Sequence, residues 1–171
     1  DQTTAEDTPL TITLTGSDVD GDALTYSAVS DNEDVSVSVV DAELTFTSSE
    51  DYNGTASVTV TVSDGFLTDS ETFTLTVTPV NDAPTIGIPD SLSFPEDGSL
   101  SMDLSEYISD LDGDDLSLSV SGNVNVNVEI IGFDITLGAT QDWYGVEILT
   151  FIVDDFQGRA IATDDITIIV T

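Results

Sequence analysis

Hydrophobic and polar residues alternate along much of this 171-residue chain. Residues 58–62 read Val-Thr-Val-Thr-Val, residues 73–77 read Phe-Thr-Leu-Thr-Val, and residues 10–15 follow the same rule. A period of two is typical of antiparallel strands that bury one face and expose the other. Glycine, aspartate and asparagine interrupt the alternation about every 8 to 12 residues, and no helical period is present. We therefore predict an all-β protein without helices.

Four acidic motifs occur twice in the same order, about 91 residues apart. The paired copies are Glu6-Asp7 and Glu96-Asp97, Asp18–Asp22 and Asp110–Asp114, Asp51–Gly54 and Asp142–Gly145, and Val62–Asp64 and Val153–Asp155. A fixed period of this kind indicates an internal structural repeat. The chain is therefore expected to contain two copies of one module.

The boundary between the copies falls within Thr78–Pro84, where two prolines favour an extended connection. We predict a first module at residues 1–79, a linker at residues 80–84 and a second module at residues 85–171. Each copy of about 90 residues has room for about seven strands, which is the strand number of an antiparallel β-sandwich.

The charge of the chain is extremely one-sided. It has 34 acidic residues and a single basic residue, Arg159, which gives a formal net charge of −33. Acidic disordered segments are poor in apolar residues, whereas 39% of this chain is hydrophobic. The acidic residues are therefore expected on the surface of a folded protein. Because the chain supplies almost no positive charge, metal ions or salt must neutralise it.

The composition excludes several functions. Without cysteine or histidine, the chain cannot form disulfides, the usual zinc sites, thiol nucleophiles or Ser-His triads. The lack of Lys and Arg argues against binding to nucleic acid or to anionic membranes. No apolar run is long enough for membrane insertion. Carboxylate pairs are abundant, but no sequence context marks a catalytic pair, so we predict a protein that is not an enzyme.

Counting strands places the acidic motifs at opposite ends of each sandwich. Glu6, Asp51 and the linker residues Asn81-Asp82 are expected at one end of the first module. The loops around Asp110–Asp114 and Asp155 are expected at the end of the second module that follows the linker. Convergence of so many oxygen ligands requires a hard cation, and Ca²⁺ fits best.

The spacing Asp-x-Asp-Gly-Asp supports a metal loop, because alternate carboxylates on a tight turn can face one ion. It differs from an EF-hand, which has its glycine at position six and a glutamate at position twelve. A solvated surface turn explains a single copy almost as well, but two copies in register favour a site. A generally acidic, salt-adapted surface is the competing explanation for the charge. It would place acids on exposed strand faces, which here carry mostly Thr and Ser.

These motifs resemble the cadherin-like, Ig-fold repeats of large bacterial extracellular adhesins. The resemblance covers essentially the whole chain, and the Asn-Asp-Ala-Pro linker at residues 81–84 is its most specific element. It implies two Ig/cadherin-like sandwiches. In classical cadherins, junction ions are bound by an early Glu, an acidic turn, the linker Asn-Asp, and a DxD loop with a late Asp of the next module. Carried over by position, the implied ligands are Glu6, Asp51, Asn81, Asp82, Asp110, Asp112 and Asp155.

Other acids remain candidates. Glu50 is a possible addition, and Asp154 is an alternative to Asp155, with Arg159 expected to pair with one of these two aspartates. The remaining predicted metal ligands lie in the acidic loops themselves, and those of the first module would serve a junction with a preceding neighbour. They are Asp18, Asp20, Asp22, Asp64 and Asp114.

The resemblance implies a Ca²⁺-rigidified extension or adhesion module of a secreted or cell-surface bacterial protein, with neighbouring repeats as partners. The adhesive target is left open between a cell-surface glycan and a second copy of the protein. The alternative function is a carbohydrate- or other ligand-binding module of a secreted multidomain protein, with Trp143 and Tyr144 as a stacking platform. Tyr52 occupies the equivalent turn of the first module, which favours a packing role for these aromatics.

Overall fold

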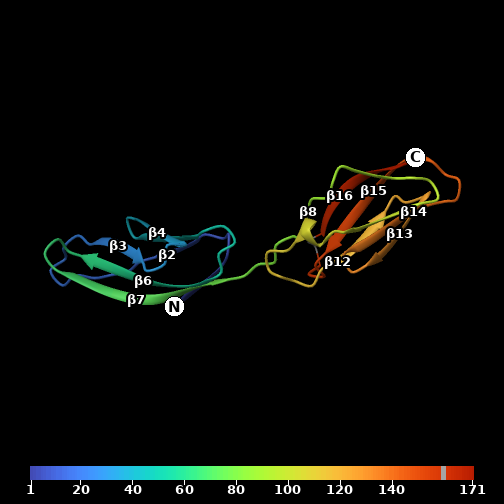
Figure 1. The fold of residues 1–171 in the computed structure, drawn as a ribbon. Coiled ribbons are helices and arrows are strands. Elements are labelled where there is room, and N and C mark those ends of the chain that lie inside the picture. The colour runs from blue at the N-terminus through green and yellow to red at the C-terminus, as the bar shows by residue number, and fades with distance from the viewer. Residues whose placement is uncertain (159–160) are drawn as a thin grey trace. The chain divides into compact units, whose positions relative to one another are not determined.

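The computed structural model describes residues 1–158 and 161–171 and separates the chain into two units, Asp1–Val80 and Asn81–Thr171 (Figure 1). Unit 2 thus includes residues 81–84, which the sequence pattern assigned to a linker. Each unit has its own hydrophobic core. We describe the two units separately.

Unit 1 is a sandwich of a four-stranded and a three-stranded sheet, with strand orders β1-β7-β6-β3 and β2-β5-β4. The strands are β1 (Gln2–Ala5), β2 (Leu10–Thr13), β3 (Thr25–Ser30), β4 (Val35–Val40), β5 (Glu43–Ser48), β6 (Gly54–Ser63) and β7 (Thr68–Thr78). The alternation seen in the sequence aims one face of each strand inward, so that Phe46, Val58 and Leu75 are fully buried.

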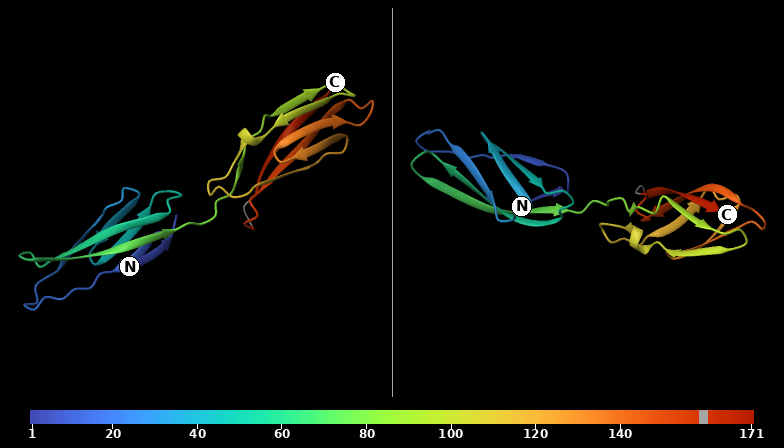
Figure 2. Two further views of the ribbon diagram at one scale, coloured as in Figure 1. Left: turned by 60° about the horizontal axis from the view of Figure 1, so that its bottom comes forward. Right: turned by 45° about the horizontal axis from the view of Figure 1, so that its top comes forward.

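Unit 2 repeats this plan with strand orders β12-β15-β16-β9 and β10-β14-β13, and adds a small β11-β8 ladder (Figure 2). Its elements are β8 (Thr85–Ile86), β9 (Ser91–Phe94), β10 (Ser99–Asp103), η1 (Ser105–Tyr107), β11 (Ile108–Ser109), β12 (Ser117–Ser121), β13 (Val126–Ile131), β14 (Asp134–Ala139), β15 (Gly145–Asp154) and β16 (Ile161–Val170). Leu149, Phe151 and Ile168 lie at the centre of its core.

The predicted all-β fold of two Ig/cadherin-like sandwiches is confirmed. Two details differ from the prediction. Element η1 is a single 3-10 turn, and β1 pairs with β7, as β9 pairs with β16, in parallel. In these two pairs β1 and β9 run in the same direction as β7 and β16, the last strand of each unit. The described residues contain no helix with the length and apolarity needed to cross a membrane.

Glu147 on β15 fastens the segment that leads into β13. Its carboxylate accepts hydrogen bonds from the main-chain N–H groups of Val124 (2.7 Å), Asn125 (2.9 Å) and Val126 (3.2 Å). Burial acts to raise the pKa of Glu147, but these donors and the Asn125 side chain outweigh burial, so the pKa is lowered. The ionised carboxylate is therefore a structural element of unit 2.

Glu147→Gln is expected to lower the free energy of unfolding of unit 2 at pH 7 by about 1 kcal/mol, because three main-chain donors lose a charged acceptor at a partly exposed site. The pKa is lower in the folded state than its usual 4.5. The contribution is therefore fully present above that value and is lost as the pH falls through the folded-state pKa. Urea unfolding from pH 7 downward measures this.

The exposed Glu129 on β13 provides the control. Glu129→Gln should leave the unfolding free energy nearly unchanged over the same pH range. A Glu147→Gln defect of constant size at every pH would contradict the assigned role of the charge.

Candidate metal-binding site

The loop after β11 gathers three carboxylates. Residues Asp110-Leu-Asp-Gly-Asp114 form a tight turn in which Gly113 adopts a φ of 76°, a conformation that suits glycine. The N–H of Asp114 donates to Asp110 Oδ1 at 3.1 Å, which closes the turn. Carboxylate oxygens of Asp110, Asp112 and Asp114 consequently lie within 4.8 Å of one another.

Two other segments of unit 2 meet this loop. Asp155, which follows β15, is 1% exposed, and its Oδ2 accepts a hydrogen bond from Asn81 Nδ2 at 2.8 Å. The N–H of Asp82 donates to Asp112 Oδ2 at 2.7 Å. Residues 81–82, the acidic loop and Asp155 therefore form one cluster inside unit 2.

Asp155 is held in its charged form. The Asn81 side chain, followed by the Gln157 N–H at 2.8 Å, lowers the pKa of this carboxyl group, while burial opposes the shift. The neighbouring Asp154 instead closes the turn after β15, since its Oδ1 accepts a hydrogen bond from the N–H of Phe156 at 2.8 Å. The buried position of Asp155 and the capping position of Asp154 distinguish two residues that were alternatives in the sequence.

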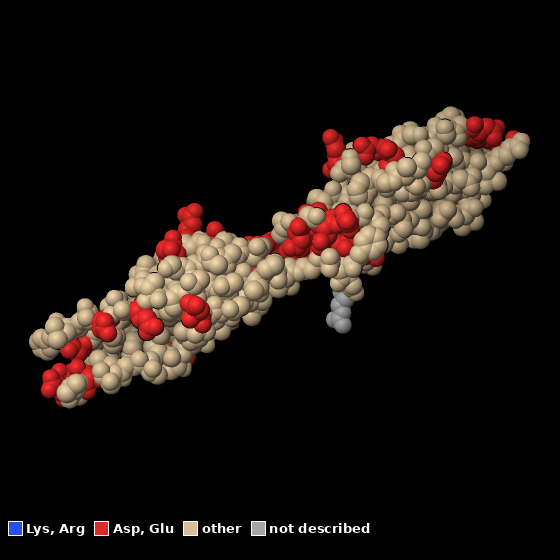
Figure 3. Space-filling model, turned by 90° about the horizontal axis from the view of Figure 1, so that it is seen from below, with Lys and Arg blue, Asp and Glu red and all other residues tan. Residues whose placement is uncertain are grey.

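One carboxylate oxygen of Asp110 is buried without a hydrogen-bond donor. This oxygen, Oδ2, accepts no hydrogen bond from any described residue. A buried, unsatisfied carboxylate oxygen is costly, and neighbouring carboxylates increase the cost by repulsion. Figure 3 shows Asp and Glu side chains gathered in dense groups on the face in view. An arrangement with oxygen donors only fits a hard cation such as Ca²⁺.

Unit 1 contains a second buried carboxylate with an unsatisfied oxygen. Glu6 is 2% exposed, its Oε1 accepts the N–H of Val80 at 2.5 Å, and its Oε2 has no hydrogen-bond partner among the described residues. Asp51 lies in a neighbouring loop with a φ of 56°, and its N–H donates to Asp7 Oδ1 at 3.3 Å. Glu50, beside it, is exposed.

In the first copy of the acidic loop, main-chain N–H groups of the loop itself bind the carboxylate of Asp18. Asp18 Oδ1 accepts the N–H groups of Asp20 (2.8 Å) and Asp22 (3.1 Å). Asp64 Oδ1 accepts the N–H groups of Leu67 and Phe66, which lower the pKa of Asp64. Among the described residues, only the second copy brings three carboxylates together within 4.8 Å. Nearly identical motifs therefore form different local arrangements.

One aromatic residue of each paired turn packs inside its own unit. Trp143 packs against the core of unit 2, and a Cβ on Gly145, which has a φ of 154°, would lie 3.0 Å from its ring. Tyr52 covers Gly54 in the same way in unit 1. Tyr144 is 73% exposed. The two aromatics of unit 2 thus have separate environments, one packed and one in solvent.

Sequence reasoning missed Gln157, whose side-chain amide donates to Asp114 Oδ1 at 3.3 Å. No motif marks it, although it lies two residues after Asp155. It also missed the main-chain N–H of Asp82 as a donor to the acidic loop. Arg159, with its expected pairing to Asp154 or Asp155, lies outside the described residues.

Comparisons with known proteins bear on the fold. A family model described as "Bacterial Ig domain" matches residues 1–78 and again residues 81–171. A search of curated proteins finds no match. Human protocadherin-24 EC1-2 is similar with a TM-score of 0.59 and 19% identity, over 94% of this chain and 87% of that chain.

Two further structures are similar at lower TM-scores, which support no further argument. Drosophila N-cadherin EC1-4 matches with a TM-score of 0.44 and 14% identity, over 98% of this chain and 46% of that chain. An endo-fucoidan hydrolase of glycoside hydrolase family 107 matches with a TM-score of 0.40 and 22% identity, over 99% of this chain. This chain spans only 27% of that hydrolase. The predicted resemblance to bacterial Ig-fold repeats is confirmed by the family model, and the protocadherin structure shares the cadherin-like fold.

Proposed function

We propose that this chain, which belongs to the bacterial Ig domain family, is a non-catalytic, Ca²⁺-binding segment of an extracellular repeat protein. Calcium bound at the acidic loop of unit 2 would stiffen the array of repeats. The array would extend outward from the bacterial cell surface or attach the cell to a target. Neighbouring repeats of the parent chain are the proposed partners. The family and the strongly acidic composition support this role.

The unsatisfied Asp110 Oδ2 is the observation that carries the proposal. In unit 2 the fold buries this oxygen, brings the carboxylates of Asp112 and Asp114 beside it, and adds the ionised Asp155. Main-chain donors are already used by Asp110 Oδ1 and Asp112 Oδ2. A bound Ca²⁺ would satisfy the remaining oxygen and remove the repulsion among the carboxylates.

The proposed ligands from unit 2 are the carboxylates of Asp110, Asp112, Asp114 and Asp155, with Asn81 and Asp82 in support. Asn81 donates from its amide nitrogen to Asp155, so its amide oxygen can face an ion. Glu6 and Asp51 stay as the ligands predicted for unit 1, and the buried Oε2 of Glu6 supports Glu6. Asp18, Asp20, Asp22 and Asp64 are proposed to serve a preceding repeat.

Removal of Ca²⁺ should destabilise unit 2. Extracellular modules bind Ca²⁺ with dissociation constants of about 10⁻⁴ to 10⁻³ M. At 100-fold excess over such a constant, linkage adds about 2.7 kcal/mol per site, which corresponds to a rise in Tm of about 10 °C or more for a domain of this size. Thermal melts with chelator and with excess Ca²⁺, at matched ionic strength, measure the difference. Identical melting temperatures would favour a salt-adapted acidic surface instead.

Asp112→Asn should weaken Ca²⁺ binding by about tenfold, because it removes one charged ligand and keeps the side-chain shape. Asp20 occupies the same place in the first copy of the motif and provides a matched control. Asp20→Asn should change the affinity of the tightest site by less than about twofold. Calorimetric titration of both variants and the unmodified chain compares them directly.

Glu6→Gln extends this test to unit 1. If Glu6 is a ligand in unit 1, Glu6→Gln should weaken Ca²⁺ binding in the same calorimetric titration. Equal losses from Asp20→Asn and Asp112→Asn would mean that each acidic loop binds its own ion, and would contradict the assignment of the main site to unit 2.

A further inference from the structure

The outer face of the four-stranded sheet in unit 2 carries exposed apolar side chains. Its central strands, β15 and β16, lie side by side (Figure 1), and alternate residues of each point away from the core. On β15, Val146 and Ile148 are 63% and 59% exposed, and Ile152 follows on the same face. Ile169 of β16 pairs directly with Val146. A solvated sheet face is ordinarily polar, so these four residues form an unusual surface.

The equivalent hairpin of unit 1 is polar at the same positions. Strands β6 and β15 both have ten residues and begin at a glycine, so Thr55 and Ser57 correspond to Val146 and Ile148. All outward residues of β6 and β7 are Thr or Ser. Because Thr favours strands as Val and Ile do, strand formation does not require apolar residues here. The contiguous apolar side chains of unit 2 therefore indicate an interaction surface.

The apolar end of this face is also free of acidic side chains. The outward residues of the flanking strands β9 and β12 are serines. Among the described residues of the four paired strands, the outward acid nearest to Ile148 is Asp165, which accepts a hydrogen bond from the Thr150 hydroxyl at 2.6 Å. The chain has 34 acidic residues and one basic residue. An uncharged surface is where a second copy meets the least electrostatic repulsion.

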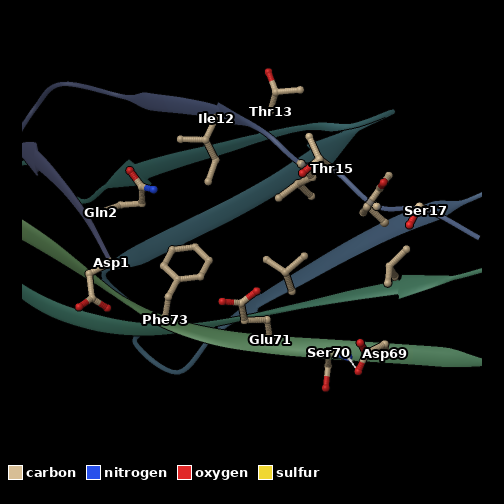
Figure 4. A pocket seen from close by; sticks show the side chains of 15 residues that line it. Asp1, Gln2, Ile12, Thr13, Thr15, Ser17, Asp69, Ser70, Glu71 and Phe73 are labelled. Atoms are coloured by element: carbon tan, nitrogen blue, oxygen red, sulfur yellow. Dashed lines mark hydrogen bonds between the residues drawn. The ribbon is translucent and has the colours of Figure 1, made fainter.

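An apolar cleft in unit 1 differs from this face in its charge. Ile12 and Phe73 line the cleft, and Asp69 and Glu71 of β7 lie along one side of it (Figure 4). A partner for the cleft would need basic groups, which another copy of this chain cannot supply. The uncharged face of unit 2 instead suits a partner surface that is itself apolar and uncharged.

We propose that the outer face of the β12-β15-β16-β9 sheet packs against the same face of a second copy of the chain. Two sheet faces pack about 10 Å apart with their strands at about 30°. In a two-fold arrangement, Val146, Ile148 and Ile169 of one copy lie against the same three residues of the other. Each copy supplies the outward surface of two ten-residue strands and two short flanking strands, roughly 500 Å².

The size of the face sets the strength of the contact. Two such faces together bury roughly 1,000 Å², which is at the lower limit for a specific interface. The expected dissociation constant is therefore about 10⁻⁴ M. Association should become tighter as salt is raised, because salt screens the repulsion between two acidic copies.

Sedimentation equilibrium of the full chain at constant Ca²⁺, up to about 0.5 mM protein, tests the proposal. Dimers should form with this dissociation constant, and more readily at about 0.5 M than at about 0.05 M NaCl. The double variant Val146→Thr/Ile148→Ser gives β15 the residues that unit 1 has at these positions. It should weaken association by about tenfold or more, while urea unfolding of unit 2 changes little because both side chains are exposed.

Ile131→Ser provides the matched control. Ile131 is 69% exposed and lies on β13, in the other sheet of unit 2, so this variant should associate as the unmodified chain does. A chain that stays monomeric at about 0.5 mM in both salt concentrations would overturn the proposal. Unchanged association of the double variant, or equal weakening by Ile131→Ser, would do so too. Association that weakens with added salt would also contradict it, since attraction between charged surfaces would then hold the copies together.

Discussion

Hydrogen bonds from main-chain N–H groups to carboxylates hold the loops of this protein together. With 34 acidic residues and one basic residue, the chain cannot stabilise its acids by ion pairs. Main-chain N–H groups stabilise the charged carboxylates instead. Asp64, Asp103, Glu147 and Asp155 all have lowered pKa values, with such bonds among the causes. Bonds to charged acceptors are worth more than neutral ones, which lets short, glycine-containing turns keep defined shapes.

The same constraint indicates where the proposed cation would bind. Main-chain N–H donors are limited in number. At two carboxylates, one in each unit, they reach only one of the two oxygens. Among the residues that the structure describes, Glu6 Oε2 and Asp110 Oδ2 are the buried side-chain oxygens without a hydrogen-bond donor. A metal ion would supply there the positive charge that a chain with one basic residue lacks. The proposed function rests on this shortage of donors rather than on the number of acidic residues.

Repetition within the chain separates local from long-range effects. The loops Asp18–Asp22 and Asp110–Asp114 have nearly the same sequence, yet only the second is tied to an Asn-Asp pair, by the bond from Asp82 N–H to Asp112. In the same way, both sandwiches share the hairpins β6-β7 and β15-β16, but only unit 2 has Ile86 and Ile88 between its sheets. In unit 2 these differences come from residues 81–88, which contact both the acidic loop and the core.

The sequence by itself determined the strands, the two modules and the identity of the acidic loops. Alternation of Val with Thr decides which face is buried, and the repeat spacing follows from motifs that are local in the chain. Only the tertiary structure decided that Asp155 is buried while Asp154 caps a turn, that Gln157 reaches Asp114, that β1 pairs in parallel with β7, and that unit 1 has a cleft. These features depend on which distant segments share a surface. Local patterns of polarity carry no information about that, because burial and hydrogen-bond supply are set by long-range packing.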